Sequence, residues 1–218
     1  KLAANDGEGG DRFGEAVAMA DDGAAAFIGC SRPEATYVFR QNSDSWTQQS
    51  KLIPNETNER VGTICTVAAN SDGTTVLVGS FVDPETDGMR VGSAYVFTSS
   101  DGTWTQQEKL TADDGDEEDL FAASIALSSN GRTALAGARG DEDPNGMRAG
   151  SAYVFTSSDG TWTQQEKITA DDGDKNDSFG ISVAVSGDGG TGLLGAAGDE
   201  DPNGEGELNG GGSAYIFE

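Results

Sequence analysis

Short stretches of alternating polar and apolar residues run along the chain, and each is long enough for one β-strand. Residues 123–128 (ASIALS) alternate small polar with aliphatic side chains, which is a period of two. The Asn130-Gly131 pair that follows is a tight-turn signal, and residues 133–138 (TALAGA) predict a second strand. Turns at intervals of about 8 to 12 residues indicate an all-β architecture.

A third and a fourth strand follow a long acidic loop. In residues 151–155 (SAYVF), Tyr153 and Phe155 share one face of the predicted strand, and the residues beside them share the other. An SSDG turn then leads to residues 161–168 (TWTQQEKI), which predict the fourth strand. We therefore expect small sheets of four antiparallel strands.

This four-strand pattern is repeated along the chain. The segment GSAYVFTSSDGTWTQQEK occupies residues 92–109 and again residues 150–167, a shift of 58 positions without a substitution. The same spacing relates Trp46, Trp104 and Trp162, and also Lys51, Lys109 and Lys167. Self-similarity at a fixed period of this length predicts a repeat architecture.

Four units result, and together they predict a single domain spanning residues 1–218. The units are residues 1–50, 51–108, 109–166 and 167–218. The first unit is eight residues short, because its acidic loop after Gly29 is replaced by the shorter CSRPEA. The last unit lacks the Trp-containing segment.

Side-chain size increases from the first strand of each unit to the last. The first two strands carry Ala, Gly, Ser and Val, and the third and fourth carry Tyr, Phe and Trp. A propeller blade needs small residues near its crowded axis and large ones at the rim. We therefore predict a β-propeller of four-stranded blades, either closed with four blades, an arc of a larger propeller, or completed by a second copy. Lys1 and Leu2 match the end of a fourth strand and could lie beside the last blade as a partial closing strand.

Two short motifs recur at equivalent places in the units. A Phe-Gly pair occurs as Phe13-Gly14 and Phe179-Gly180, nearly as Phe121-Ala122, and is replaced by Thr63-Ile64 in the second unit. A later element begins with glycine and lacks a following proline: Gly29-Cys30, Gly79-Ser80, Gly137-Ala138 and Gly195-Ala196. These motifs resemble the FG-GAP repeat, the blade unit of integrin-α-type propellers.

The resemblance extends to the sequences of the loops, and it implies a function. The segments DEDPNG, WTQQ and LTADDGD look like those of secreted repeat proteins from salt-loving archaea and some marine bacteria. An integrin-like propeller of this kind, usually seven-bladed, implies an extracellular or cell-surface binding or adhesion module with a protein or glycan ligand. Two alternatives are a structural repeat subunit that self-assembles into a larger array and a polysaccharide-acting enzyme.

The charge of the chain limits the classes of molecule that it can bind. Asp and Glu number 38 against 13 Lys and Arg, with no His, so the formal net charge is −25. Such a surface repels phosphates and anionic lipid headgroups, which excludes nucleic acids and simple membrane-surface binding. Because salt screens the self-repulsion, the charge favours a saline, halophilic habitat. Simple solubility is the alternative explanation.

Three acidic loops between the predicted second and third strands are candidate calcium sites. Each has oxygen side chains at its first, third and fifth positions and glycine at its sixth, as in the opening of a calcium loop. The candidate ligands are Asp83, Glu85 and Asp87, then Asp141, Asp143 and Asn145, then Asp199, Asp201 and Asn203, with Glu207 as a further ligand. Integrin-type blades, however, carry this motif between the first and second strands. An ordinary acidic turn is therefore the alternative.

A second acidic cluster precedes the first strand of two units. Its members are Asp113, Asp114, Asp116 and Asp119, repeated as Asp171, Asp172, Asp174 and Asp177. An ion site is one interpretation, and a solvated run of charge with Asx-type turns is the other. Asp11, Asp119 and Asp177 each lie two residues before the Phe of the Phe-Gly position, which predicts a structural hydrogen bond at the strand entrance.

The aromatic and sulfur-containing residues have similar pairs of interpretations. The three tryptophans could stack on sugars, but their identical placement in successive units favours packing between blades at the rim. Cys30 and Cys65 are too few for a disulfide scaffold, and they could form one bridge or be two small buried residues.

Nothing in the sequence supports catalysis. The chain has no His to serve as a general base near neutral pH. It also lacks a G-x-S-x-G nucleophile motif and a glycine-rich phosphate loop between a strand and a helix. We therefore expect a protein that is not an enzyme.

Overall fold

The computed structural model describes residues 1–32, 34–55, 64–80, 90–142, 148–199 and 211–218. Within these residues every regular element is a β-strand, and no helix long and apolar enough to cross a membrane is found. The strands are β1 (Ala16–Met19), β2 (Ala25–Ser31), β3 (Glu34–Asn42), β4 (Ser45–Leu52), β5 (Ile64–Ala69), β6 (Thr75–Ser80), β7 (Ser93–Ser100), β8 (Thr103–Leu110), β9 (Phe121–Leu127), β10 (Thr133–Ala138), β11 (Ser151–Ser158), β12 (Thr161–Ile168), β13 (Phe179–Val185), β14 (Gly192–Ala196) and β15 (Ser213–Phe217).

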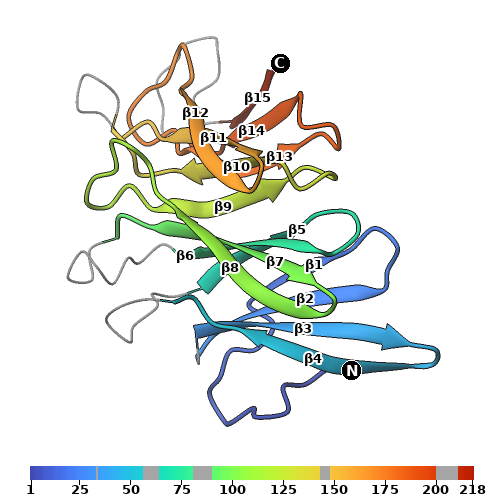
Figure 1. The fold of residues 1–218 in the computed structure, drawn as a ribbon. Helices are drawn as coiled ribbons and strands as arrows, with labels where there is room; N and C mark the ends of the chain where they lie inside the picture. Colours follow the sequence, from blue (N-terminus) through green and yellow to red (C-terminus); the bar gives the residue numbers. More distant parts are fainter. Residues whose placement is uncertain (33, 56–63, 81–89, 143–147, 200–210) are drawn as a thin grey trace.

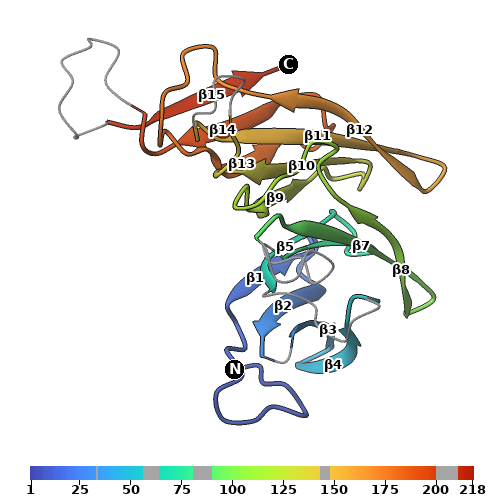
Figure 2. The ribbon, with the colours of Figure 1, turned by 90° about the vertical axis from the view of Figure 1, so that its left-hand side faces the viewer.

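The strands form four antiparallel sheets in chain order. We call them blade 1 (β1 to β4), blade 2 (β5 to β8), blade 3 (β9 to β12) and blade 4 (β13 to β15). The first three have four strands each, and blade 4 has three. Figures 1 and 2 show the blades following one another from blade 1, beside the N-terminus, to blade 4, which ends at the C-terminus. The predicted all-β propeller fold is confirmed, and the four blades form an open arc.

The observed strands begin and end close to the positions that the sequence pattern predicts. β10 and β12 coincide with the predicted second and fourth strands, and β11 continues three residues further, to Ser158. The fourth strands end at Leu52, Leu110 and Ile168, two residues beyond the ends of the repeat units. The link to the next blade therefore begins inside the following unit.

The first strands of neighbouring blades face one another along the inside of the arc. β1 contacts β5, β5 contacts β9, and β9 contacts β13. Two glycines on the second strands allow the backbones of neighbouring blades to lie this close together. A Cβ atom at Gly137 would lie 1.9 Å from the carbonyl oxygen of Gly180, and one at Gly79 would lie 2.4 Å from that of Ala122. Both elements of the recurring motifs therefore meet at the contact between consecutive blades.

A hydroxyl on the first strands of blades 2 and 3 reinforces this contact. Thr66 Oγ1 donates a hydrogen bond to the backbone oxygen of Ala122 at 2.9 Å. Ser124 Oγ donates to that of Gly180 at 2.6 Å. The two bonds are 58 residues apart and join blade 2 to blade 3 and blade 3 to blade 4. Such bonds fix the register between blades, which apolar packing alone does not specify.

Aromatic residues fill the outer part of the blades. The ring of Phe121 meets Tyr153 and Phe155 edge-on, with centroids 5.5 and 5.9 Å apart. Equivalent triads occur in blade 1 around Phe13 and in blade 4 around Phe179. The prediction that Tyr153 and Phe155 share one face is confirmed, because they pack in the core between blades 2 and 3. Their neighbours on β11 pack toward blade 4.

The N-terminal segment corrects one expectation. Leu2 and Ala4 pack against the core of blade 1, together with Trp46. Lys1 and Leu2 therefore do not lie beside the last blade as a closing strand. Instead they lie on blade 1 next to Phe39 and Gln48, the place that the end of β4 takes on blade 2.

Candidate functional site

The strand ends define two faces of the arc. The turn face carries the tight connections from first to second and from third to fourth strands. The loop face carries the connections from second to third strands and the links between blades. The units differ in length on the loop face. The second-to-third connection is short in blade 1, between Ser31 and Glu34. In the fourth unit, Tyr215 lies 48 positions after Lys167, against 44 positions from Lys109 to Tyr153 in the third.

The loop face of blade 3 holds a compact polar cluster, which we call the carboxylate–lysine node: Asp114, Asp141, Tyr153 and Lys167. The Tyr153 hydroxyl lies 2.8 Å from Asp114 Oδ1 and 2.6 Å from Asp141 Oδ2. Lys167 Nζ lies 2.7 Å from Asp114 Oδ2 and 2.9 Å from Asp141 Oδ2. The ammonium group also lies 5.5 Å from the centre of the Tyr153 ring. The link, the acidic loop, β11 and β12 each contribute one residue.

The ionisation of the node follows from these contacts. Burial pushes the pKa of Asp114 upward, but the hydrogen bonds from Lys167 and Tyr153 outweigh it and hold this pKa below the ordinary value. Burial lowers the pKa of Lys167, and the hydrogen bonds to Asp114 and Asp141 raise it above the ordinary value. The pKa of Tyr153 is strongly raised by burial and by the same two carboxylates. The node therefore holds a charged lysine at neutral pH, within hydrogen-bond distance of Asp114 and Asp141.

A cleft of about 500 Å³ opens beside the node. Its lining comprises six carboxylates and one lysine: Asp114, Asp116, Glu117, Asp119, Asp141, Glu142 and Lys167. Asp119 is only 3% exposed. Burial, with the charges of Asp141 and Asp116, raises its pKa to about 6. The cleft is therefore strongly negative and suited to a cationic group.

The node recurs in the other blades with parts exchanged or missing. In blade 4, the Tyr215 hydroxyl lies 2.9 Å from Asp172 Oδ1 and 2.7 Å from Asp199 Oδ2. In blade 1, Lys51 binds Asp6 at 2.6 Å and lies over the Tyr37 ring. The shortened loop of blade 1 contains no second aspartate. In blade 2, Lys109 lies over Tyr95, and the positions equivalent to Asp114 and Asp141 are outside the described residues.

Two of the predicted calcium ligands lie among the described residues. Asp141 and Asp199, each first in its acidic loop, are buried and bonded to Tyr153 and Tyr215. The other candidate ligands lie outside the described residues: Asp83, Glu85, Asp87, Asp143, Asn145, Asp201, Asn203 and Glu207. Among the residues that are described, no group of three or more acidic or sulfur ligands is arranged to hold a metal ion. The calcium sites remain a prediction.

The second acidic cluster divides into structural and solvent-facing residues. The Asp119 carboxylate accepts a hydrogen bond from the backbone N–H of Asp116, and that of Asp177 accepts one from Asp174. The Asp11 carboxylate accepts one from Glu8 in the same way. The predicted structural hydrogen bond before the Phe-Gly position is thus confirmed in three units.

The tryptophans pack between successive blades. The Trp104 ring on β8 meets Phe27 of blade 1 edge-on, with centroids 5.8 Å apart. Trp162 is 7% exposed and packs in the core shared by blades 2 and 3. Packing between blades, rather than sugar stacking, is confirmed for these two residues. Cys30 is a buried free thiol, and burial raises its pKa.

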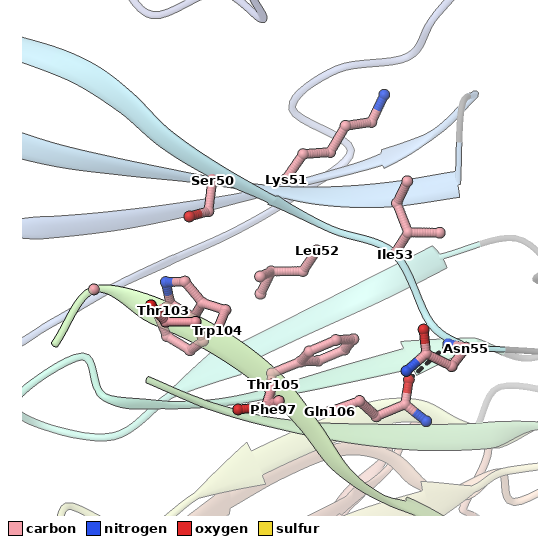
Figure 3. A pocket seen from close by; sticks show the side chains of 11 residues that line it. Ser50, Lys51, Leu52, Ile53, Asn55, Phe97, Thr103, Trp104, Thr105 and Gln106 are labelled. Carbon is pink, nitrogen blue, oxygen red and sulfur yellow. Dashed lines mark hydrogen bonds between the residues drawn. The ribbon is translucent and has the colours of Figure 1, made fainter. Parts of the chain in front are cut away.

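A glutamine beside each tryptophan was not singled out by the sequence analysis. Figure 3 shows Gln106 reaching the link between blades 1 and 2, where its Oε1 accepts a hydrogen bond from the backbone N–H of Asn55 at 2.7 Å. Gln48 and Gln164 make the same bond to Asn5 and Asp113. The unchanged TQQ in three units was the available signal, but it gave no hint of a partner some fifty residues away.

These features define a repeat protein whose blades form an arc of a β-propeller. The profile of the FG-GAP repeat matches residues 1–31, 104–155 and 162–217. The chain belongs to the FG-GAP repeat family. A search of curated proteins gives no match.

Solved structures share the fold at low sequence identity. The hydrazine synthase of Kuenenia stuttgartiensis aligns with a TM-score of 0.60 and 16% identity over 100% of this chain and 49% of that one. A putative 6-phosphogluconolactonase from Bacteroides uniformis gives 0.56 and 15%, covering 84% and 47%. The β-propeller domain of Myceliophteria thermophila Cps50 (Swd1) gives 0.56 and 12%, covering 92% and 52%. The chain thus spans about half the length of the structures it matches.

Proposed function

We propose that this chain is a non-catalytic binding or adhesion module that works outside the cell or at its surface. The observation that carries the proposal is the contrast between the two faces of the arc. The turn face is uniform from unit to unit, while the loop face varies in loop length and holds the acidic cleft of blade 3. Variable loops on a rigid scaffold are a common way to build a binding surface. FG-GAP repeats are also typical of extracellular and cell-surface proteins.

The cleft indicates the chemistry of the ligand. Six carboxylates around one lysine leave an excess of negative charge, and these residues come from the link, the acidic loop and β12. A cationic group of a protein or glycan ligand at the cell surface fits this environment. Long-range attraction of this kind mainly accelerates association and weakens as salt is added.

A charge-matched pair of variants tests the proposal. In the first, Asp116→Asn, Glu117→Gln and Glu142→Gln remove three of the six carboxylates of the cleft and spare the node. In the second, Asp44→Asn, Asp101→Asn and Asp159→Asn neutralise three residues on the turn face. We expect the cleft variant to lose at least tenfold in affinity for surfaces coated with polylysine or chitosan, and the turn-face variant to change little. Equal losses would mean that only net charge matters and would contradict a site on the loop face.

Calcium stabilisation is a second part of the proposal. The three acidic loops keep the oxygen ligands at alternate positions and the glycine at the sixth position that open a calcium loop, and bound cations would also screen the net charge of −25. A ligand that binds only the native state raises the melting temperature. We expect calcium, added after chelation at fixed high potassium chloride, to raise the melting temperature, and magnesium to do so less. An unchanged melting temperature would remove calcium from the account.

We further propose that the chain is adapted to a saline environment. Its excess of carboxylates repels itself at low ionic strength, and salt screens this repulsion. The free energy of unfolding should therefore rise when sodium chloride increases from about 0.1 to about 2 M. A flat or falling dependence would favour simple solubility.

Self-assembly into a larger array is the second candidate function, and the two end faces favour it. On blade 4, Leu193 is 46% exposed, whereas the equivalent Leu77 and Leu135 are 1% and 2% exposed under the next blade. On blade 1, Val17 is 70% exposed, whereas the equivalent Val67 packs against the preceding blade. The two end faces are thus the two halves of an interblade contact. Sedimentation of the wild type and of Leu193→Asp tests this: the array requires wild-type oligomers that the substitution dissociates.

A further inference from the structure

A groove lies between the outer strands of blades 1 and 2 and shares no residue with the acidic cleft of blade 3. Its volume is about 390 Å³, within the range of roughly 300–1,000 Å³ that is typical of small-molecule sites. One wall is the end of β4 with the link that follows it, and the other wall is β8 (Figure 3). The buried side chains of Leu52 and Phe97 line the groove from the core. The groove therefore has an apolar floor.

A sister groove between blades 2 and 3 is lined by the residues 58 positions later, and one of its side chains is different. There, Glu108 Oε2 accepts a hydrogen bond from the backbone N–H of Trp162 at 3.1 Å. Ser50 takes the place of Glu108 in the groove between blades 1 and 2. Its side chain is much shorter than that of a glutamate and carries no carboxylate. The first groove therefore lacks the acceptor that the sister groove supplies to itself.

Trp104 has two N–H groups at the place where this acceptor is missing. The register of β7 with β8 is that of β11 with β12, so the backbone N–H of Trp104 points to the outer edge of its blade, as that of Trp162 does. No described residue accepts a hydrogen bond from it. The Trp104 indole Nε1 is buried and also has no partner in the described part of the chain. Figure 3 shows this nitrogen on the side of the ring that faces β4. Because an unpaired donor is unfavourable, a ligand oxygen would be stabilised here.

The charge of the groove indicates which kind of oxygen would fit. Its polar lining is mostly neutral: Ser50, Asn55, Thr103, Thr105 and Gln106. Lys51 also lines the groove, but its ammonium group is bound to Asp6 at 2.6 Å. A chain with a net charge of −25 repels anions, so a free carboxylate is a poor substitute for that of Glu108. An uncharged hydroxyl oxygen meets both conditions.

The remaining polar groups indicate more than one hydroxyl. Gln106 uses its Oε1 to accept the hydrogen bond from the Asn55 N–H, which leaves its amide NH₂ as a donor without an acceptor among the described residues. The hydroxyl groups of Thr103 and Thr105 lie on the same wall, and both residues are exposed. A sugar ring combines several hydroxyl groups with apolar C–H faces. It therefore matches both the polar wall and the apolar floor.

We propose that the groove between blades 1 and 2 binds an uncharged sugar residue of a glycan. One sugar hydroxyl accepts hydrogen bonds from Trp104, at the position that Glu108 occupies in the sister groove. The C–H groups of the sugar lie against Leu52 and Phe97. The Trp104 ring packs edge-on against Phe27, so the sugar is held by hydrogen bonds and not by stacking on this ring. The site is separate from the acidic cleft and does not depend on the ligand proposed there.

The indole N–H signals of the three tryptophans report on the site in the full chain. Neutral trisaccharides of glucose, galactose, mannose, xylose or N-acetylglucosamine are titrated at fixed high potassium chloride, and NMR follows the three signals. We expect at least one sugar to shift the Trp104 signal saturably, with a dissociation constant on the order of 1 mM, and to leave Trp46 and Trp162 unchanged. Binding should persist in salt, because no ion pair holds the sugar.

Ser50→Glu copies the sister groove and is the decisive variant. Its carboxylate should bond to Trp104 and fill the groove, so sugar affinity should fall at least about tenfold while the melting temperature is kept or raised. A variant that only damaged the fold would lower the melting temperature instead. Glu108→Ser is the matched control in the sister groove, and it should leave the Trp104 titration unchanged. Unaltered sugar binding by Ser50→Glu would overturn the proposal.

A second measurement covers weak binding of short sugars. The native chain is run in gels that contain a neutral polysaccharide of each sugar, where repeated contacts increase retardation. Retardation of the wild type that is lost in Ser50→Glu supports the site. The proposal is overturned if no neutral sugar shifts the Trp104 signal or retards the chain, if all three tryptophans shift alike, or if a trisaccharide of galacturonate binds more tightly than the neutral sugars.

Discussion

Blade 3 and blade 4 carry an equivalent tyrosine and two equivalent aspartates, yet among the described residues only blade 3 has a lysine between them. Tyr153 and Tyr215 each lie within hydrogen-bond distance of two carboxylates. In blade 3, Lys167 arrives on the fourth strand and binds both. The fourth strand of blade 3 therefore also supplies a cation to the acidic link and the acidic loop. One side chain couples strand pairing to the electrostatics of the loop face.

The same two blades differ in what covers them. Blade 3 lies against blade 4, and the glycine on its second strand touches the backbone of the next blade. Blade 4 exposes the equivalent surface, including Leu193 and Ile216. Blade 4 is therefore a copy of blade 3 without its fourth strand and without its outer neighbour. The following substitutions test that difference, beginning with the largest expected effect.

Replacement of Gly137 by alanine should be the most damaging. The new Cβ would lie 1.9 Å from the backbone oxygen of Gly180, which cannot move without separating blades 3 and 4. We expect a loss of about 3 kcal/mol or more in the free energy of unfolding, measured by urea denaturation. At Gly195, the nearest atom is the Ser182 side chain at 2.5 Å, which can rotate, so alanine there should cost about 1 kcal/mol. Equal losses at the two sites would contradict the open end of blade 4.

Removal of the lysine from the node should come next. Lys167→Met leaves Asp141, whose side chain is 5% exposed, without its cation. We expect a loss of about 2 kcal/mol by urea denaturation, because an uncompensated buried charge is costly. Lys51→Met is the control, since its partner Asp6 has a side chain that is 50% exposed, and its effect should be clearly smaller. A larger loss for Lys51→Met would show that the node does not stabilise blade 3.

The buried carboxyl of Asp119 should make stability depend on pH. Its pKa is about 6 in the folded chain, above the ordinary value of roughly 3.9. The native state then binds more protons than the unfolded state in this interval, so this group lowers stability as pH rises from about 4 to 6. Asp119→Asn keeps an acceptor for the N–H of Asp116 and removes the titration. Its stability relative to the wild type should rise by on the order of 2 kcal/mol over the interval, and a constant difference would contradict the raised pKa.

The glutamine bond between a blade and its preceding link should have the smallest effect. Gln164→Ala removes the acceptor of the Asp113 N–H, which is exposed to water. We expect a loss of about 0.5 to 1 kcal/mol. Gln165→Ala is the control, since among the described residues Gln165 bonds to Thr163 of its own strand and to no other residue. If both variants unfold at the same urea concentration, the glutamine does not tie the blade to its link.

Much of the fold could be predicted because the local pattern of polar and apolar residues indicates each strand. β10 and β12 were predicted from the alternation of polar and apolar residues and from the turn signals between strands. The repeat of 58 residues predicts the equivalent strands in the other units. The gradient from small to aromatic residues then indicates radial blades. The hydrogen bond of Asp119 was also predictable, because its partner is three residues away.

The node was harder to predict because its parts are far apart in sequence. Asp114 and Lys167 are 53 residues apart, and neither spacing nor residue type shows that they meet. The sequence of the acidic loop predicted metal binding, yet the Asp141 carboxylate is bonded to Tyr153 and Lys167. The open arc was likewise one of several alternatives, since side-chain size does not determine how many blades are present or whether they close.

Hydrogen exchange of the backbone amides in β11 and β15 tests the central claim most directly. The claim is that blade 4 repeats blade 3 but ends in an open strand edge. In the part of the chain that the structure describes, β11 pairs with a strand on both sides, and β15 pairs with β14 alone. In the isolated chain, alternate amides of β15 should exchange much faster than the equivalent amides of β11. Equal protection in the two strands would contradict the account.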